Sequence, residues 1–234
     1  MNLRLSALLL SGAAFLTACV EPVPSNPSTQ APKTVTSQAA GEARFTRVVS
    51  RMEPIAEQQC RALVASNVNC DFAILLDDDP NKGSNAYQTL DRNGRPILAF
   101  TAQILTEFQN DDELAFVLGH EAAHHIEGHI AETQTTAVAG ALAGGLLAAV
   151  LGGGQAAVDI GSNLGGSVGA RAYSKDHELE ADRLGAIITE RAGYDALRGA
   201  AFFERIPDPG DRFLGSHPPN GQRIQVVKET VAGL

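Results

Sequence analysis

The residues best suited to chemistry form the run His120-Glu121-Ala122-Ala123-His124. On an α-helix, residues four apart lie on one face, so the imidazoles of His120 and His124 point the same way. Two neutral imidazoles placed like this can each give zinc one nitrogen, and Glu121 lies beside the metal, where it can hold a water molecule. The pattern indicates a zinc hydrolase, a hypothesis that needs a third ligand and a suitable structural context.

The residues before this run predict the helix that the two histidines require. Asn110 can cap the first exposed N–H groups, and Glu113 stands at the third helical position. Gly119 lowers the helix propensity by about 1 kcal/mol relative to Ala, and its small size allows close packing. An apolar stripe along the same helix consists of Leu114, Val117 and Leu118.

A second helix, predicted over residues 171–190, offers the third ligand. Glu178 and Asp182 are four apart and share a face of that helix. A carboxylate from a second helix is the usual third ligand when such a motif supplies two histidines, so we expect Glu178 to bind zinc. Asp182 can accept a hydrogen bond from a ligand imidazole and fix its tautomer. The alternative for Glu178 is a solvated surface charge.

The remaining histidines of the helical region fit a ligand role less well. A metzincin-type third histidine would stand ten positions after His120, where the chain has Ile130. His129 stands nine positions after His120, nearly on the opposite side of a continuous helix. We therefore expect His125 and His129 to be packing or surface residues, and His177 to point away from the metal.

The two motifs together resemble a known family. They are similar to those of the zinc metallopeptidase family of the CAAX prenyl proteases and HtpX, which includes the periplasmic proteases BepA and LoiP. The likeness covers about residues 45–230. The segments that carry it are His120 to His124, Glu178-Leu179-Glu180-Ala181-Asp182, Tyr173-Ser174, Ser216-His217-Pro218-Pro219 and Arg223-Ile224.

This resemblance implies an α+β fold that is mainly helical, a zincin-like domain of the gluzincin type. Because we expect no transmembrane helix of the kind found in the prenyl protease and HtpX branches, the chain resembles the soluble periplasmic lipoprotein branch. In that branch a histidine like His217 approaches the zinc, as a reversible fourth ligand or to stabilise the oxyanion. Tyr173 is a second candidate for that stabilisation, and a loop histidine without a role is the alternative for His217. Lys175 stands where the family often has Arg, which leaves a salt bridge there open.

The start of the chain reads as an export signal. Residues 1–18 combine Arg4 with an almost wholly apolar run that is too short for a comfortable membrane span. Leu-Thr-Ala-Cys19 resembles a bacterial lipobox, so we expect a lipid on Cys19 and, from Val20, sorting to the outer membrane. An ordinary secretory signal cut elsewhere is the alternative.

Export sets the expected domain organisation and the state of the other cysteines. Residues 19–40 are rich in Pro and small polar residues and read as a tether, and residues 41–234 read as one peptidase domain. In an oxidising compartment we expect a Cys60–Cys70 disulfide, worth about 2–3 kcal/mol. Two free buried thiols are the alternative. The net charge of −9 argues against a nucleic-acid partner.

A small antiparallel sheet is predicted next to the metal-site helix. Short apolar runs at 72–76, 86–90 and 96–101 read as strands, the last two joined by an Asn-Gly turn, and a short helix follows at 102–108. We expect 96–101 to be the edge strand that holds extended substrate through backbone hydrogen bonds.

Residues 137–170 consist mostly of Ala, Gly, Leu and Val. A membrane span is the alternative here, but six of the eighteen residues 137–154 are Gly, and three of these end the run. We expect a small-residue helix and loop packed near the cleft, followed by a Gly-rich connector over 161–169.

These residues predict a zinc-dependent metalloendopeptidase with one zinc ion per chain, in which Glu121 is the general base. By resemblance, its substrates are misfolded or unassembled polypeptides in the periplasm, its lipid holds it to a membrane, and the outer-membrane assembly machinery is a candidate partner. The alternative is a non-catalytic envelope chaperone or assembly lipoprotein whose structural zinc is closed by four protein ligands.

Overall fold

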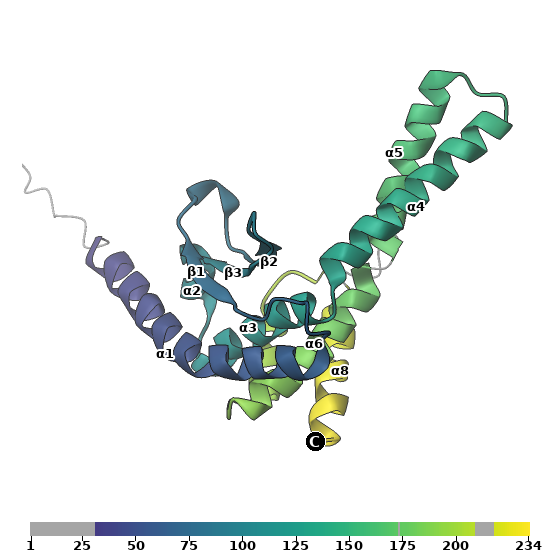
Figure 1. The fold of residues 1–234 in the computed structure, drawn as a ribbon. Coiled ribbons are helices and arrows are strands. Elements are labelled where there is room, and N and C mark those ends of the chain that lie inside the picture. Colours follow the sequence, from purple (N-terminus) through teal and green to yellow (C-terminus); the bar gives the residue numbers. More distant parts are fainter. Residues whose placement is uncertain (1–30, 173, 209–217) are drawn as a thin grey trace, which may run out of the picture.

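The computed structural model describes residues 31–172, 174–208 and 218–234. The described chain is mainly helical, with one small sheet beside the helices α1 (Ala31–Leu63) and α3 (Asp111–Ile126), as Figure 1 shows. Its strands are β1 (Ala73–Asp77), β2 (Ala86–Leu90) and β3 (Pro96–Thr101). Its helices are α1 (Ala31–Leu63), α2 (Ala102–Glu107), α3 (Asp111–Ile126), α4 (His129–Val150), α5 (Gln155–Ala172), α6 (Ser174–Arg191), α7 (Ala196–Ala200) and α8 (Asn220–Ala232), with short 3-10 turns η1 (Pro80–Lys82) and η2 (Ala201–Glu204).

The sheet has the strand order β1-β3-β2. Strand β2 pairs antiparallel with β3, with Ala86 opposite Phe100, whereas β1 pairs parallel with β3, with Ala73 opposite Ile97. The expected mainly helical α+β domain with a small sheet beside the metal-site helix is confirmed, but the sheet is mixed rather than antiparallel. The prediction that 96–101 is the edge strand is wrong, because β3 lies in the centre and β2 forms an edge.

Helix α3 is the central element of the domain. The Asn110 side chain accepts a hydrogen bond from the Glu113 N–H at 3.0 Å, and a Glu113 carboxylate oxygen accepts one from the Gln109 N–H at 2.8 Å. This reciprocal cap satisfies donors that the first turn cannot satisfy itself. Helices α1, α6 and α7 and strand β3 pack around α3, so that nearly all its side chains are buried.

Two glycines bring α3 and α6 into backbone contact. A Cβ atom on Gly185 would lie 2.8 Å from the backbone nitrogen of His120, and one on Gly119 would lie 2.7 Å from the carbonyl oxygen of Gly185. Any larger side chain would therefore push the two helices apart. The small residue at Gly119 thus permits the close packing that its position in the motif suggested.

A disulfide joins Cys60 near the end of α1 to Cys70 just before β1, with 5.7 Å between the Cα atoms. Cys60 is fully buried and Cys70 nearly so. These are the two cysteines that we expected to pair. The bond closes a short loop and fixes the sheet to the end of the long first helix.

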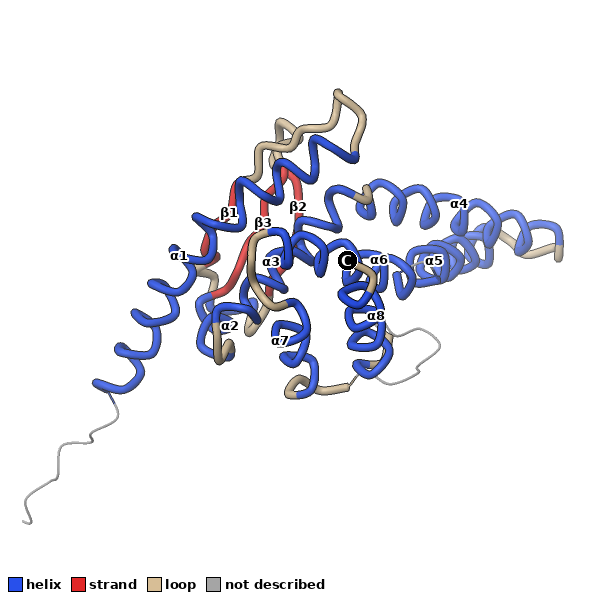
Figure 2. Tube along the Cα trace, turned by 90° about the horizontal axis from the view of Figure 1, so that it is seen from below, coloured by secondary structure: helices blue, strands red, loops and turns tan. Residues whose placement is uncertain are grey.

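Helices α4 and α5 form a hairpin that extends away from the rest of the domain, as both Figure 1 and Figure 2 show. The two helices pack mainly against each other, and they reach the body where α4 begins beside α3 and where α5 meets α6. The expectation of a helix and loop packed near the cleft is wrong for this segment. The supposed connector 161–169 is also wrong, because these residues lie within α5.

Candidate metal centre

The side chains of His120, His124 and Glu178 meet where α3 and α6 cross. The Nε2 atoms of the two histidines lie 3.0 Å apart. The Glu178 carboxylate oxygens lie 3.5 Å from Nε2 of His120 and 3.4 Å from Nε2 of His124. One donor atom from each residue lies within 4.8 Å of the others, so the three expected ligands form one cluster.

The orientation of His120 is fixed from behind by a buried ion pair. Asp182, which is fully buried, accepts a hydrogen bond from Nδ1 of His120 at 2.9 Å and two from Arg223 at 2.7 Å. Burial alone would raise the pKa of Asp182, but the charge of Arg223 and hydrogen bonds from His120 and Arg223 hold that pKa below its ordinary value. Although burial lowers the pKa of His120, hydrogen bonds to Asp182 and Glu178 raise it to about 10. Asp182 keeps one proton on Nδ1, so Nε2 is the atom that loses its proton when a metal binds.

The orientation of His124 is fixed by a second histidine. Nδ1 of His124 lies 2.8 Å from Nδ1 of His129, and Nε2 of His129 lies 3.2 Å from a carboxylate oxygen of Glu180. Burial, reinforced by the nearby His124 and His177, lowers the pKa of His129 to about 3, so its ring is neutral near neutral pH.

A neutral ring carries one proton, which decides the tautomers of both histidines. Because a carboxylate only accepts, the proton of His129 lies on Nε2, toward Glu180. Nδ1 of His129 then accepts a hydrogen bond from Nδ1–H of His124, and Nε2 of His124 carries a lone pair.

The cluster therefore fits a zinc ion by the chemistry of its donors. The Nε2 atoms of His120 and His124 converge on one point from two sides, and the Glu178 carboxylate closes a third side. Two imidazole nitrogens and one carboxylate are a typical ligand set of catalytic zinc sites, which keep a further position for water or substrate.

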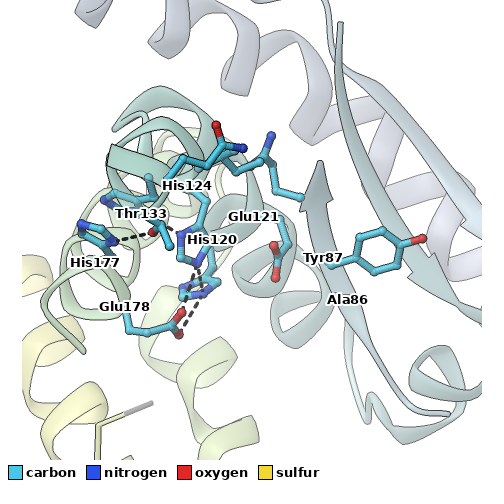
Figure 3. A pocket seen from close by; sticks show the side chains of 12 residues that line it. Ala86, Tyr87, His120, Glu121, His124, Thr133, His177 and Glu178 are labelled. Atoms are coloured by element: carbon cyan, nitrogen blue, oxygen red, sulfur yellow. Dashed lines mark hydrogen bonds and ion pairs between the residues drawn. The ribbon is translucent and has the colours of Figure 1, made fainter. Parts of the chain in front are cut away.

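A cavity of about 470 Å³ opens directly on this cluster. Its wall includes Glu121, the edge strand β2 at Ala86 to Gln88, and the first turns of α4 at Ile130 and Thr133. Figure 3 shows the Glu121 carboxylate between the two ligand histidines and strand β2. Glu121 thus faces the space in which a substrate would lie against the metal.

A second cavity lies on the other side of the cluster. It shares Ala86, His120, Glu121 and Glu178 with the first and continues between η2 and α8. The two cavities together form a groove that runs past the donor cluster along β2. Such a groove suits an extended chain rather than a compact small molecule.

Several residues of the site differ from the sequence-based expectation. His129 is a packing residue, as expected, but it contacts a ligand directly, and His177 lines the cavity and stacks on His129 with ring centroids 4.3 Å apart. His177 nevertheless stands outside the donor cluster, in keeping with the prediction that it points away from the metal. The sequence marks Arg223 only through the resemblance, because its burial beside Glu178 and Asp182 depends on how α8 packs on α6. Three further predicted residues, Cys19, Tyr173 and His217, lie outside the described residues.

Comparison with known proteins gives a consistent picture. Residues 43–231 match the model of peptidase family M48. The beta-barrel assembly-enhancing protease of Escherichia coli K12 is 32% identical over 117 residues, which cover 47% of this chain and 24% of that protein. The metalloprotease YcaL of the same strain is 28% identical over 134 residues, which cover 55% of this chain and 52% of that protein. The mitochondrial metalloendopeptidase OMA1 of Saccharomyces cerevisiae is 30% identical over 158 residues, which cover 63% of this chain and 44% of that protein. The matches span from about a quarter to about half of these relatives.

Proposed function

This chain belongs to peptidase family M48, and we propose that it is a zinc-dependent endopeptidase of the bacterial envelope. The observation that carries the proposal is the convergence of His120, His124 and Glu178 beside Glu121 in a groove bordered by an edge strand. A structural zinc site is usually closed by four protein ligands, whereas the described residues supply three and leave a cavity beside them. That difference favours an enzyme over a scaffold.

We assign the metal-binding role to His120, His124 and Glu178, with Asp182 and His129 holding the two imidazoles in place. A zinc ion held there supplies a Lewis acid that polarises a peptide carbonyl and makes a nearby water molecule more acidic. The hydrogen bonds described above keep both Nε2 atoms directed at the metal position without any rearrangement of the rings.

Glu121 acts as general base and then as general acid in this proposal. Its carboxylate takes a proton from the attacking water and delivers it to the amine nitrogen that leaves. The position of Glu121 on the walls of both cavities supports this role, because the scissile bond of a substrate in the groove would lie beside it.

The substrate is an extended polypeptide that adds to the edge of β2. Ala86, Tyr87 and Gln88 border the cavity, and β3 occupies only one side of their strand. Backbone hydrogen bonds along such an edge bind a peptide without demanding a particular sequence. This binding mode suits an enzyme that acts on misfolded or unassembled proteins.

The envelope location rests on the lipobox-like segment that ends at Cys19 and on the name of the beta-barrel assembly-enhancing protease among the relatives. We propose that Cys19 carries a lipid, that the outer membrane is the site of action, and that the beta-barrel assembly machinery is a candidate partner. Incorporation of labelled palmitate into the wild type, and not into Cys19→Ser, tests the anchor. Equal labelling of both proteins would contradict it.

The enzymatic proposal is tested by Glu121→Gln, with Glu127→Gln, one residue beyond the end of the same helix, as the control. We expect Glu121→Gln to bind one zinc ion per chain like the wild type and to cleave casein about 10²- to 10⁴-fold more slowly, because it lacks the general base. Glu127 lies outside both cavities, so its variant should keep full activity. Undiminished cleavage by Glu121→Gln would refute the mechanism.

A further inference from the structure

The hairpin of α4 and α5 exposes an unusual amount of apolar surface. More than half of the large exposed apolar side chains of the described chain lie on it, each with between 61% and 78% of its surface exposed. They are Val138, Leu142, Leu146, Leu147, Val150, Leu151, Ile160 and Leu164. Contiguous apolar surface of this kind marks a contact with another apolar phase or partner.

The hairpin also lacks charge over most of its length. Residues 133–158 contain no Asp, Glu, Lys or Arg. Helix α4 is long and apolar enough to cross a membrane, yet only 6% of its most apolar window is buried. A core helix of a soluble protein would be mostly buried, and a signal sequence would lie near the N-terminus. Neither explanation applies to α4.

The contact between the two helices is made by small residues. Gly140 and Gly144 on α4 face Gly165 and Gly161 on α5, and each pair follows the Gly-x-x-x-Gly spacing. A Cβ atom on Gly165 would lie 2.1 Å from the carbonyl oxygen of Gly140, so the backbones touch. The large side chains therefore point outward and the small ones inward. This is the arrangement of helices packed in lipid, where burying leucine between helices brings no hydrophobic gain.

A row of polar side chains follows one edge of the hairpin. Gln155, Asp159 and Asn163 recur every fourth residue along α5, and the Gln155 amide donates a hydrogen bond to the Asp159 carboxylate at 2.8 Å. The glycine contacts with α4 lie on the opposite side of α5. The edge formed by Gln155, Asp159 and Asn163 thus suits polar headgroups. The apolar side chains of α4, from Val138 to Val150, form a face that suits acyl chains.

From these observations we propose that the α4–α5 hairpin inserts into one leaflet of a lipid bilayer, with α4 in the hydrocarbon and the Asp159 edge at the headgroups. The uncharged α4 face complements uncharged acyl chains and offers no charge for a polar protein partner. The first residue of α1, Ala31, stands twelve positions after Cys19, a reach of at most about 40 Å. A lipid on Cys19, which the proposed function assigns, would hold the hairpin near the same membrane.

The absence of tryptophan from the sequence permits a site-specific test. Single tryptophans are placed on the α4 face by Leu146→Trp, on the polar edge by Asn163→Trp, and at the far end of the body by Leu234→Trp. Each full-length variant is mixed with phosphatidylethanolamine and phosphatidylglycerol vesicles whose acyl chains carry bromine, which quenches tryptophan on contact. All three variants have the same N-terminal anchor, so the anchor cannot cause a difference in quenching between them.

We expect Leu146→Trp to lose most of its fluorescence and to shift to shorter wavelength, while Leu234→Trp keeps its emission and Asn163→Trp loses little. Equal quenching of Leu146→Trp and Leu234→Trp would overturn the proposal. So would a blue shift of Leu146→Trp without lipid and without bromine quenching, because this would show that a second copy or another protein covers the face. Casein cleavage by the same variants, measured without vesicles, reports the proposed function separately.

Discussion

The Nδ1 atoms of His124 and His129 lie 2.8 Å apart although the two residues belong to different helices. Helix α3 ends at Ile126, and Gly128, with a φ of 76°, turns the chain so that α4 starts back toward the metal centre. Few residues other than glycine adopt this φ readily. The turn gives His124 a partner that sets its tautomer.

His129→Ala should therefore weaken zinc binding by about 10- to 100-fold, because His124 loses the acceptor that keeps its Nε2 lone pair toward the metal. His129→Asn offers an amide oxygen as acceptor and should recover part of the affinity. Competition with a zinc-sensitive chelating dye measures these affinities.

His125→Ala serves as the control for this prediction. His125 lies on the same helix next to the ligand, but its ring contacts the carbonyl oxygen of Asn69 instead of the cluster. If zinc affinity falls equally in the His125 and His129 variants, the cause is a general loosening of the helix end and not the loss of the hydrogen-bond acceptor of His124.

Gly185→Ala should separate the two helices that carry the ligands. The new Cβ would lie 2.8 Å from the His120 nitrogen, so α6 must move, at a cost of about 1–3 kcal/mol in unfolding free energy. Zinc affinity should fall as well, because Glu178 moves with α6. Gly221→Ala on α8 meets nothing within 4 Å and should instead stabilise by about 0.5–1 kcal/mol. Urea unfolding checks both, and a stabilising Gly185→Ala would contradict the close contact.

Arg223→Met should be among the most destabilising single changes. It leaves the fully buried Asp182 without its cationic partner, which typically costs about 3–5 kcal/mol. Arg198→Met removes an ion pair with Asp112 in which the arginine side chain is 62% exposed, and should cost less than about 1 kcal/mol. Urea unfolding in the presence of a chelator compares the two. If the two losses were equal, the buried pair would not be the support of the His120 ring.

Asp111 should make the stability of the domain depend on pH at the acid end. Its carboxylate binds Arg47 at 2.7 Å and 2.9 Å, and hydrogen bonds from Arg47 outweigh partial burial to lower the pKa of Asp111. Because the folded pKa lies below the unfolded one, this stabilisation is complete above about pH 4 and is lost as the pH falls through the folded pKa.

Solvent screening limits the size of this effect to about 0.5–1 kcal/mol. The unfolding free energy of Asp111→Asn should therefore fall below that of the wild type near neutral pH and approach it in acid. A double-mutant cycle with Arg47→Gln isolates the pair. A difference between wild type and Asp111→Asn that stayed constant with pH would argue against the assigned shift.

The parts of the fold and site that depend on local periodicity could be predicted from the sequence. His120 and His124 share a face because they are four apart, and the strand at 86–90 was placed by its turn signals. Periodicity does not predict on which side a residue lies once a helix has ended and a new one has begun. His129 would lie opposite the ligands on a continuous helix, and only the turn at Gly128 brings it to His124.

Features that depend on contacts between distant parts of the chain could not be predicted from local sequence patterns either. The central position of β3 depends on its parallel pairing with β1, which is separated from it by another strand in the sequence. The glycines of 161–169 predict a connector, whereas Gly161 and Gly165 are the contact points of two helices. Glycine content alone does not distinguish these two uses.

Helix α4 joins two regions with different chemistry in a single unbroken element. Its first residue, His129, touches a metal ligand, and its last turn lies at the apolar tip. Such a helix is a lever about 33 Å long, so a displacement of the tip by about 3 Å turns its base by about 5°. If the tip is held in lipid as proposed, a displacement of the tip would reach the ring of His124 through His129.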